Sequence, residues 1–293
     1  MLSHLSNTRK GILFALAGYT GFAMSDVCAK WLTQHYSSYQ VIVMDTAFAS
    51  LIFLCLSPFI GGWRSIFDKK GRKIHLLRMG LNTAINFMVV YLFTQMPLST
   101  LYAMLFTKPF FAALLAVFLY GQKLVSTRVI AIIVGFAGVL IAMRPDSGIE
   151  PVMLLSLLCA FTIALMFLIS RSLEGASIFS LGFLPMIASC LLTLPFALPG
   201  FEPIEPLHFV PVVLSGIFMS IGIIGVSLAF RTAAAAAVSP FLYTEMIWAL
   251  GLGFVIFGDL PDIWMLAGAA IIIASGIYLL ETERRAENKA PVQ

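Results

Sequence analysis

The chain has 293 residues, of which 60% are hydrophobic and only 11% are charged, and its mean hydropathy is +0.98. This composition excludes a water-soluble globular protein, because about a quarter of the residues in a typical soluble domain are charged. The formal net charge of +4 does not indicate a nucleic-acid-binding protein, since the basic residues lie between apolar runs and form no basic face. We therefore expect an integral membrane protein that contacts the lipid bilayer and binds no nucleic acid.

Ten apolar segments, separated by charged or turn-forming residues, follow one another along the chain. In order they are residues 11–33, 39–60, 78–96, 99–119, 127–143, 151–170, 176–199, 207–230, 237–257 and 262–281. A helix needs roughly 20 predominantly apolar residues to cross the hydrocarbon core of a bilayer. The sequence therefore predicts an all-α integral membrane protein with ten transmembrane helices.

The 18 Lys and Arg residues are distributed unevenly among the connections. Nearly all of them fall in connections or tails that face the cytoplasm if the amino terminus does, and only Lys30, Lys108 and Arg144 lie elsewhere. Cytoplasmic loops of membrane proteins carry the excess of Lys and Arg. We therefore expect a multi-pass membrane protein with both termini in the cytoplasm.

The two halves of the chain resemble each other. Aligning residues 102–121 with residues 239–258 pairs Phe106 with Tyr243, Thr107 with Thr244, Phe111 with Trp248 and Gly121 with Gly258. Each half contains five spans, and an odd number of spans ends on the opposite side of the membrane from where it starts. The second half therefore enters the membrane from the opposite side, so that the repeats are inverted. We expect a first five-helix repeat at residues 1–145, a second at 146–282 and a cytoplasmic tail at 283–293. Inverted repeats supply two packings, one open to each side of the membrane, which is typical of secondary transporters.

Short motifs recur at the ends and centres of the predicted spans. In the first half they are 96–100 (MPLST), 106–110 (FTKPF) and 120–123 (YGQK), and in the second half 229–231 (AFR), 240–243 (PFLY) and 257–261 (FGDLP). Together with the doubled pattern of five spans, they resemble the EamA-type ten-helix members of the drug/metabolite transporter superfamily. The resemblance implies a secondary carrier that alternates access, with a central cavity lined by the first, third, fourth, sixth, eighth and ninth helices. It does not specify a substrate.

Lys108 and Glu245 are repeat-equivalent charged residues near the middle of the fourth and ninth spans. A charged side chain at the bilayer centre costs at least about 2.5–3.5 kcal/mol, so each needs a polar partner. In one interpretation the ammonium and the carboxylate hold opposite ends of a zwitterionic substrate. In the other they form an ion pair that joins the two halves, and a pair that substrate or a proton must break would act as a switch.

Two further carboxylates lie inside predicted spans. Asp26 is one helical turn before Lys30, so a local ion pair would explain both residues. Alternatively, Asp26 contacts a proton or a second cation, and Glu245 is the other candidate for proton or cation coupling. Asp45 lies nearer the outer end of its span, where we expect an outer vestibule or a structural role.

Aromatic and amide side chains supply the remaining candidate substrate contacts. Trp248 lies three residues after Glu245 and shares its helix face, which suits an organic cation through cation–π attraction. Asn86 forms an i, i+4 stripe with Asn82, and such amides either contact substrate or join helices. The other expected contacts, for each of which ordinary packing is the alternative, are Tyr243, Tyr102, Tyr19 and Phe22.

The sequence contains no nucleotide-binding loop and no zinc-protease motif, and its four Cys residues lie singly in apolar segments. We therefore expect no catalytic residue, no metal site and no cofactor. The predicted function is secondary active transport of a small charged or zwitterionic organic metabolite, amino-acid-like in character, with S-adenosylmethionine as a specific contender. The alternative function is export of hydrophobic amines or drugs. The rival class of protein is a channel or a structural membrane protein. A homodimer is compatible with the sequence, although no feature requires it.

Overall fold

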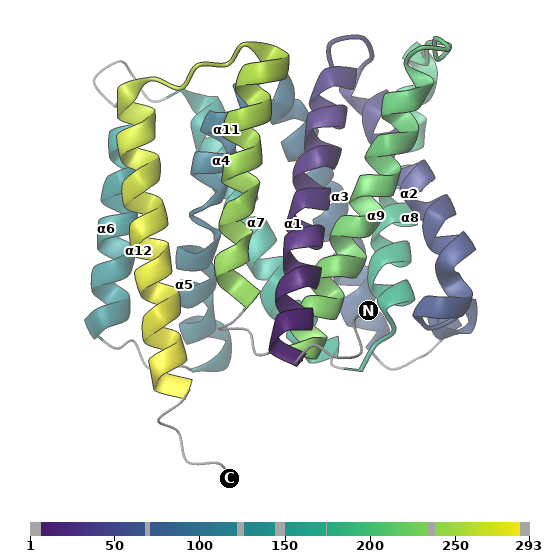
Figure 1. Cartoon of the computed structure of the whole chain (residues 1–293). Coiled ribbons are helices and arrows are strands. Elements are labelled where there is room, and N and C mark those ends of the chain that lie inside the picture. The colour runs from purple at the N-terminus through teal and green to yellow at the C-terminus, as the bar shows by residue number, and fades with distance from the viewer. Residues whose placement is uncertain are drawn as a thin grey trace. The chain divides into compact units, whose positions relative to one another are not determined.

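The computed structural model describes residues 7–67, 71–121, 126–143, 150–173, 175–233 and 238–287 (Figure 1). Within these ranges the regular secondary structure is entirely helical. The α-helices are α1 (Asn7–Leu32), α2 (Ser38–Ile60), α3 (Arg72–Gln95), α4 (Leu98–Leu105), α5 (Lys108–Tyr120), α6 (Ser126–Met143), α7 (Pro151–Ser170), α8 (Ile178–Ala197), α9 (Phe209–Thr232), α11 (Thr244–Phe257) and α12 (Ile263–Glu287). Short 3-10 helices are η2 (Trp63–Phe67), η4 (Arg171–Leu173), η5 (Leu198–Gly200) and η6 (Ser239–Tyr243).

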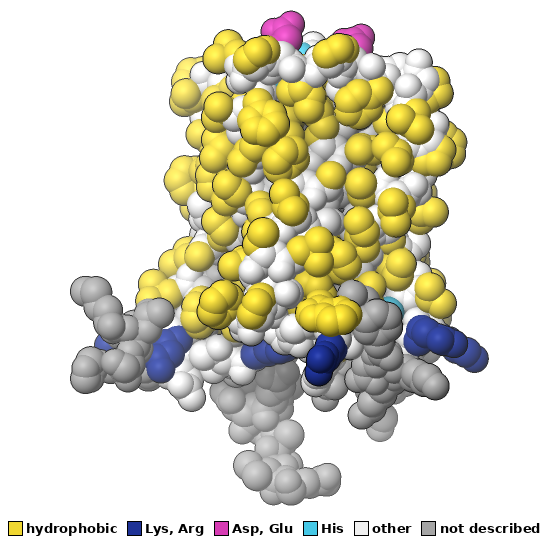
Figure 2. Space-filling model, turned by 90° about the vertical axis from the view of Figure 1, so that its right-hand side faces the viewer, with side chains coloured by type: hydrophobic (Ala, Val, Ile, Leu, Met, Phe, Trp, Pro, Cys, Tyr) yellow, Lys and Arg dark blue, Asp and Glu magenta, His cyan; other side chains and the backbone are white. Residues whose placement is uncertain are grey.

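Eight helical segments of the described chain are long and apolar enough to cross a membrane. Three of them, Leu98–Tyr120, Ile178–Gly200 and Pro240–Phe257, combine consecutive helices. Two shorter apolar stretches, Val129–Ala142 and Ile263–Leu279, lie where further spans are predicted. On the face shown in Figure 2, hydrophobic side chains cover the helices along their length, as lipid-facing surfaces require. The all-helical, multi-pass membrane architecture predicted from composition is confirmed.

The fourth predicted span is broken. The sequence pattern indicates one apolar segment at residues 99–119, but α4 ends at Leu105 and α5 begins at Lys108. Pro109 explains the interruption, because proline has no amide hydrogen to donate to the carbonyl of Leu105, four residues earlier. The ninth span shows a related feature, since it opens as the 3-10 helix η6, which contains Pro240, before α11 begins.

Two helices, α3 and α12, each extend six residues past a predicted end. The third span was expected at residues 78–96, but α3 begins at Arg72, so Arg78 lies inside a helix and not in a cytoplasmic connection. The last helix continues from the predicted end at residue 281 to Glu287. Residues 281–287 are rich in Glu, Arg and Ala, which favour helix without needing the membrane. The first part of the expected tail is therefore helical.

The chain divides into two compact units that do not coincide with its two halves. Unit 1 comprises residues 1–15, 97–168 and 229–293, and unit 2 comprises residues 16–96 and 169–228. In unit 1, α12 packs along α6 and α11 packs against α4 (Figure 1). In unit 2, α8 packs against both α2 and α3. Each unit thus combines helices from the two halves of the sequence.

An aromatic cluster marks the core of unit 2. The side chains of Phe53, Phe179 and Phe183 are buried, and the last two rings stack with centroids 5.0 Å apart. The ring of Phe53 lies directly against Gly182 of α8. Because Gly182 has no side chain, α2 and α8 approach each other closely, which is the usual way in which membrane helices pack.

Candidate functional site

The break in the fourth span and the start of the ninth have matching local structures. The hydroxyl of Thr107 donates a hydrogen bond of 2.7 Å to the carbonyl of Met104, and the hydroxyl of Thr244 donates one of 2.7 Å to the carbonyl of Phe241. In both cases a threonine binds the carbonyl three residues earlier. In both cases the next residue is charged and lies at the start of a helix, since α5 begins at Lys108 and α11 begins at Thr244, one residue before Glu245.

Lys108 and Glu245 form an ion pair in unit 1. The distance between Lys108 Nζ and Glu245 Oε2 is 3.5 Å, and the two side chains are only 13% and 6% exposed. Glu245 lies in the first turn of α11, where the positive end of the helix dipole favours a carboxylate. Lys108 lies in the first turn of α5, where the same dipole disfavours a cation. Glu245 therefore compensates the charge of Lys108, which the dipole of α5 does not stabilise.

Two aromatic rings accompany this ion pair. The rings of Phe106 and Tyr243, which are repeat equivalents, have centroids 5.2 Å apart. The ammonium of Lys108 lies 6.0 Å from the centroid of the Phe106 ring, at the outer limit of cation–π contact. Tyr243 lies two residues before Glu245, a spacing that points to a different helix face in regular α-helix. The end of η6 nevertheless places Tyr243 beside the segment that precedes Lys108.

The remaining predicted residues of unit 1 lie on the same two spans. Tyr102 is buried in α4, and Trp248 is half-buried in α11, one turn after Glu245. The hydroxyl of Tyr243 lies against Gly276 of α12 and has no hydrogen-bond partner in the described structure. The structure thus brings Lys108, Glu245 and Tyr243 together and keeps Tyr102 and Trp248 on the adjoining turns.

The other predicted site residues belong to unit 2. On α1, Tyr19 is buried and Asp26 is half-buried. The ring of Phe22 lies against Gly222 of α9, where an added Cβ would approach its Cδ1 to 2.5 Å. Phe22 therefore fills a gap between two helices, which is the packing alternative. Lys30 donates a hydrogen bond of 3.3 Å to the carbonyl of Met96, at the end of α3.

The amide stripe on α3 divides into two roles. Asn82 donates a hydrogen bond of 3.1 Å to the hydroxyl of Ser189 on α8, and Thr83 shares the same hydroxyl at 3.1 Å. Asn82 therefore joins two helices. Asn86, one turn further along α3, has a buried side-chain nitrogen without a hydrogen-bond partner in the described structure. Of the two amides, Asn86 is therefore the one whose side-chain nitrogen can donate a hydrogen bond to substrate.

The sequence did not predict that Ser215 is the hydrogen-bond partner of Asp45 or that Arg78 is buried. The hydroxyl of Ser215 donates a hydrogen bond of 2.6 Å to Asp45 Oδ1, which supports the structural role expected for that carboxylate. Nothing local marks Ser215 as its partner, since the two residues lie far apart in the chain. Arg78, by contrast, precedes Asn82 and Asn86 at helical spacing, and this spacing was a usable signal for a longer α3.

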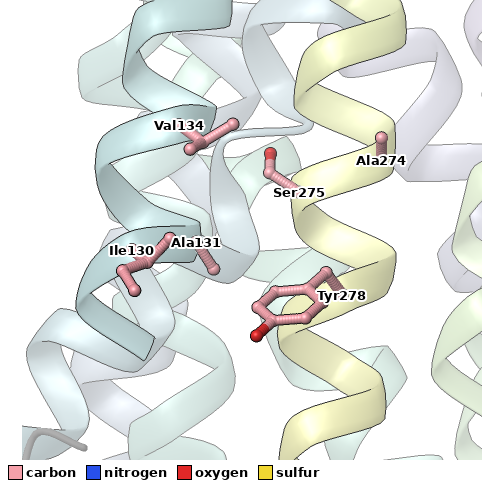
Figure 3. A pocket seen from close by; sticks show the side chains of 6 residues that line it. All are labelled: Ile130, Ala131, Val134, Ala274, Ser275 and Tyr278. Atoms are coloured by element: carbon pink, nitrogen blue, oxygen red, sulfur yellow. The ribbon is translucent and has the colours of Figure 1, made fainter. Parts of the chain in front are cut away.

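None of these residues lines the pocket drawn in Figure 3. It is formed between α6 and α12 and is lined by Ile130, Ala131, Val134, Ala274, Ser275 and Tyr278. Ile130 and Tyr278 are among the exposed hydrophobic side chains. Because exposed apolar side chains of a membrane protein face lipid, we interpret this pocket as a groove on the lipid-facing surface and not as the candidate site.

The chain matches the model of the EamA-like transporter family twice, over residues 9–144 and again over residues 151–281. The chain belongs to the EamA-like transporter family. This membership confirms the resemblance to drug/metabolite transporters that the motifs indicate, and it assigns the chain to transporters and not to enzymes. The doubled match also agrees with a two-repeat layout of the EamA-like fold.

Several relatives extend over nearly the whole EamA-like chain. The S-adenosylmethionine uptake transporter of Rickettsia conorii is 26% identical, with 95% of each chain covered. The riboflavin transporter of Rhizobium johnstonii is 25% identical, with 95% of this chain and 93% of the relative covered. A protein of known crystal structure shares the fold with a TM-score of 0.69 and 15% identity, covering 95% of this chain and 99% of its own. With these bacterial relatives and its apolar helices, the chain is a multi-pass protein of a bacterial membrane.

Proposed function

We propose that this protein is a secondary carrier that moves a small charged or zwitterionic organic metabolite across the bacterial inner membrane by alternating access. In this proposal ten transmembrane helices form two inverted five-helix repeats, residues 1–145 and 146–282, and both termini are cytoplasmic. The matching hydrogen bonds of Thr107 and Thr244 support the repeat. So does the packing of α2 with α8 and of α6 with α12, because each pair joins helices at equivalent positions in the two halves.

The ion pair between Lys108 and Glu245 is the observation that carries the proposal. A substrate that carries both a carboxylate and a cationic group offers each of these two residues a new partner of opposite charge. The cost of separating the buried charges is then offset by two new charge pairs, whereas a substrate with only one charge leaves the other residue uncompensated. The pair thereby favours zwitterions and couples substrate binding to a rearrangement between α5 and α11.

The proposal assigns a role to each side chain. Lys108 binds the substrate carboxylate, and Glu245 with Trp248 binds its cationic part. The aromatic residues Tyr243 and Tyr102 form walls on the same spans, and Tyr19 and Phe22 contribute walls from α1. Asn86, whose nitrogen lacks a partner, donates a hydrogen bond to substrate. Asp26 binds a proton or a second cation. Glu245 takes part in the same proton or cation coupling when substrate leaves.

S-adenosylmethionine is the specific substrate that we propose. It carries a carboxylate, an ammonium and a sulfonium, so it offers one group for Lys108 and two for carboxylates. The relatives named S-adenosylmethionine uptake transporters support this choice, since four of them match the chain over about 95% of its length. Riboflavin is the second candidate because two riboflavin transporters also match most of the chain.

The decisive experiment compares S-adenosylmethionine with its decarboxylated analogue, which keeps both cationic groups but lacks the carboxylate. Uptake of each is measured in proteoliposomes, together with the thermal stabilisation of the purified protein. Lys108→Ala is expected to abolish uptake of S-adenosylmethionine and to spare the analogue. The matched control is Lys73→Ala, an exposed lysine of α3. Equal loss of both substrates in Lys108→Ala contradicts the assignment, and stabilisation by riboflavin alone selects the second candidate.

Exchanging the two charges separates binding from folding. The variant Lys108→Glu with Glu245→Lys keeps an ion pair at this position but inverts it. We expect this double variant to fold and to lose transport, because the substrate carboxylate then meets a carboxylate. Full recovery of transport in the exchanged protein would show that the pair holds the helices together and does not contact substrate.

A further inference from the structure

Arg78 is a buried cation that has no counter-charge among the residues that the structure describes. It lies six residues into α3, about 9 Å along the helix axis from Arg72, and is only 8% exposed. Its Nη2 donates a hydrogen bond of 3.3 Å to the carbonyl of Leu181 on α8, while Nε and Nη1 are buried without a hydrogen-bond partner. No acidic side chain in the described part of unit 2 forms an ion pair with it. A guanidinium in this position is strongly disfavoured unless an anion accompanies it.

The one hydrogen bond of Arg78 has a structural explanation that leaves the other donors unused. Pro185 lies inside α8 and has no amide hydrogen, so the carbonyl of Leu181, four residues earlier, lacks its helical partner. Nη2 of Arg78 supplies that partner. A neutral donor such as glutamine would do the same without a buried charge. The positive charge and the two remaining donor atoms therefore need a different explanation.

Arg78 contacts α8 near its amino terminus, at the carbonyl of Leu181, the fourth residue of this helix. Ser177 caps this helix, and its hydroxyl accepts a hydrogen bond of 3.0 Å from the amide of Ser180. The same hydroxyl is linked at 2.7 Å to the hydroxyl of Ser65 in η2. The first amides of a helix have no partner within it, and with the dipole they favour an anion. Arg78 therefore contacts α8 close to an amino terminus that itself favours an anion, at the end of unit 2 where α3 and α8 begin.

We propose that Arg78 and the first turn of α8 bind a phosphate group at this end of unit 2. Guanidinium, helix amides and serine hydroxyls are together the donors that bind phosphate oxygens. The phosphate comes from a phospholipid of the adjacent leaflet or from free inorganic phosphate, since both present the same oxyanion. This site is separate from Lys108 and Glu245, which lie in unit 1.

Thermal unfolding of the purified full-length protein tests the site with two kinds of probe. One probe is inorganic phosphate against chloride at equal ionic strength, and the other is phosphatidylglycerol against diacylglycerol with the same acyl chains. The test variant is Arg78→Gln, which removes the charge but keeps a neutral amide donor at this position. The matched control is Arg72→Gln, an exposed arginine at the start of the same helix.

We expect phosphate or phosphatidylglycerol to raise the Tm of the wild type and of Arg72→Gln, and Arg78→Gln to bind at least about tenfold more weakly. Stabilisation by phosphatidylglycerol alone identifies a lipid phosphate, and stabilisation by phosphate alone identifies a soluble one. Equal stabilisation of Arg78→Gln and the wild type overturns the proposal, as does the absence of stabilisation by either probe.

Hydrogen exchange of the wild type keeps the proposal testable if Arg78→Gln does not fold. The bound phosphate is expected to slow exchange of the first amides of α8, those of Ile178 and Phe179. The first turn of α9, which begins at Phe209, serves as the reference because it holds none of the proposed ligands. Unchanged exchange at Ile178 and Phe179 with both probes overturns the site.

Discussion

Gly138 of α6 and Gly268 of α12 face each other where these two helices pack tightly together. A Cβ atom added to Gly138 would lie 2.9 Å from the carbonyl oxygen of Gly268, and one added to Gly268 would lie 2.5 Å from the carbonyl oxygen of Gly138. Membrane helices gain little from hydrophobic association in lipid, so close packing of small residues holds them together. This contact joins two helices that occupy equivalent positions in the two halves of the chain.

Gly268→Val is therefore expected to destabilise unit 1. The added side chain has to displace backbone atoms of α6, and overpacking of this kind costs about 1–3 kcal/mol. A lowered Tm of the purified protein is the expected result. The control is Gly251→Val in α11, where an added Cβ meets nothing within 4 Å. Equal Tm values for the two variants would contradict the close approach of α6 and α12.

The buried pair of Lys108 and Glu245 predicts an asymmetry between single and double replacement. Lys108→Met leaves an uncompensated carboxylate, and Glu245→Met leaves an uncompensated ammonium, each at a cost of about 3–5 kcal/mol. Replacing both residues with methionine removes both charges at similar volume, and buried ion pairs replaced in this way are often neutral for stability. Both single variants should show a low Tm, and the double variant a Tm near that of the wild type.

Transport by the double methionine variant then reports on function. If the pair binds substrate, the variant is folded but inactive in the proteoliposome assay, because neither charge remains to bind a zwitterion. A double variant that is as stable and as active as the wild type would remove Lys108 and Glu245 from the substrate site. Independent behaviour of the two single variants, with additive losses of Tm, would contradict the ion pair itself.

Hydropathy predicts the helices of this protein well, because a bilayer requires long apolar helices whose backbone groups are satisfied internally. The interruption at Phe106 and Thr107 was missed, since both residues fit an apolar span and only Pro109 signals the break. The start of α3 at Arg72 was missed because buried arginines are rare in spans, so Arg78 was assigned to a connection. In both places local chemistry departs from the apolar pattern that defines the rest of the fold.

In the candidate site, only the contact between residues at equivalent positions of the two repeats was predictable from the sequence. Aligning the halves pairs Lys108 with Glu245, and the structure places their charged groups 3.5 Å apart. No such symmetry links Asp45 to Ser215, so that contact appears only once α2 and α9 are placed in space. The close contact between Tyr243 and Phe106 was not expected from ideal helix geometry, because η6 alters the direction in which Tyr243 points.

The hydrogen bond from Ser215 to Asp45 predicts a specific loss of stability in unit 2. Ser215→Ala removes a donor from a buried, charged acceptor, and we expect the protein to lose about 1.5–3 kcal/mol of stability. Asp45→Asn in the same background should recover part of this loss, because a neutral amide is easier to bury. Ser220→Ala in α9 is the control, since that hydroxyl donates to the carbonyl of Gly216 in its own helix at 2.8 Å and makes only a long contact of 3.5 Å with the neutral carbonyl of Ala49 on α2. A larger loss of Tm in Ser220→Ala than in Ser215→Ala would contradict the assignment.

Tyr36 is expected to hold the segment that precedes α9 in place. Its hydroxyl accepts a hydrogen bond of 3.0 Å from the amide of Glu205, so its own hydrogen is free to be donated to Nδ1 of His208, 2.9 Å away. Tyr36→Phe removes both bonds while keeping the ring. The residues from 201 to 208 should then open more often, and amide exchange at Glu205 should accelerate by about tenfold, since a net hydrogen bond contributes about 0.5–1.5 kcal/mol.

The neighbouring tyrosine provides the control for this prediction. Tyr39 is 43% exposed, and its described contacts are between rings, with Phe87 and Phe196. Tyr39→Phe should therefore leave exchange at Glu205 unchanged. If Tyr36→Phe also leaves it unchanged, the segment is held by the pair of hydrogen bonds between Gln40 and the backbone of Glu202, at 2.7 and 3.0 Å, and not by Tyr36. Acceleration in both variants would instead indicate a general loosening of α2.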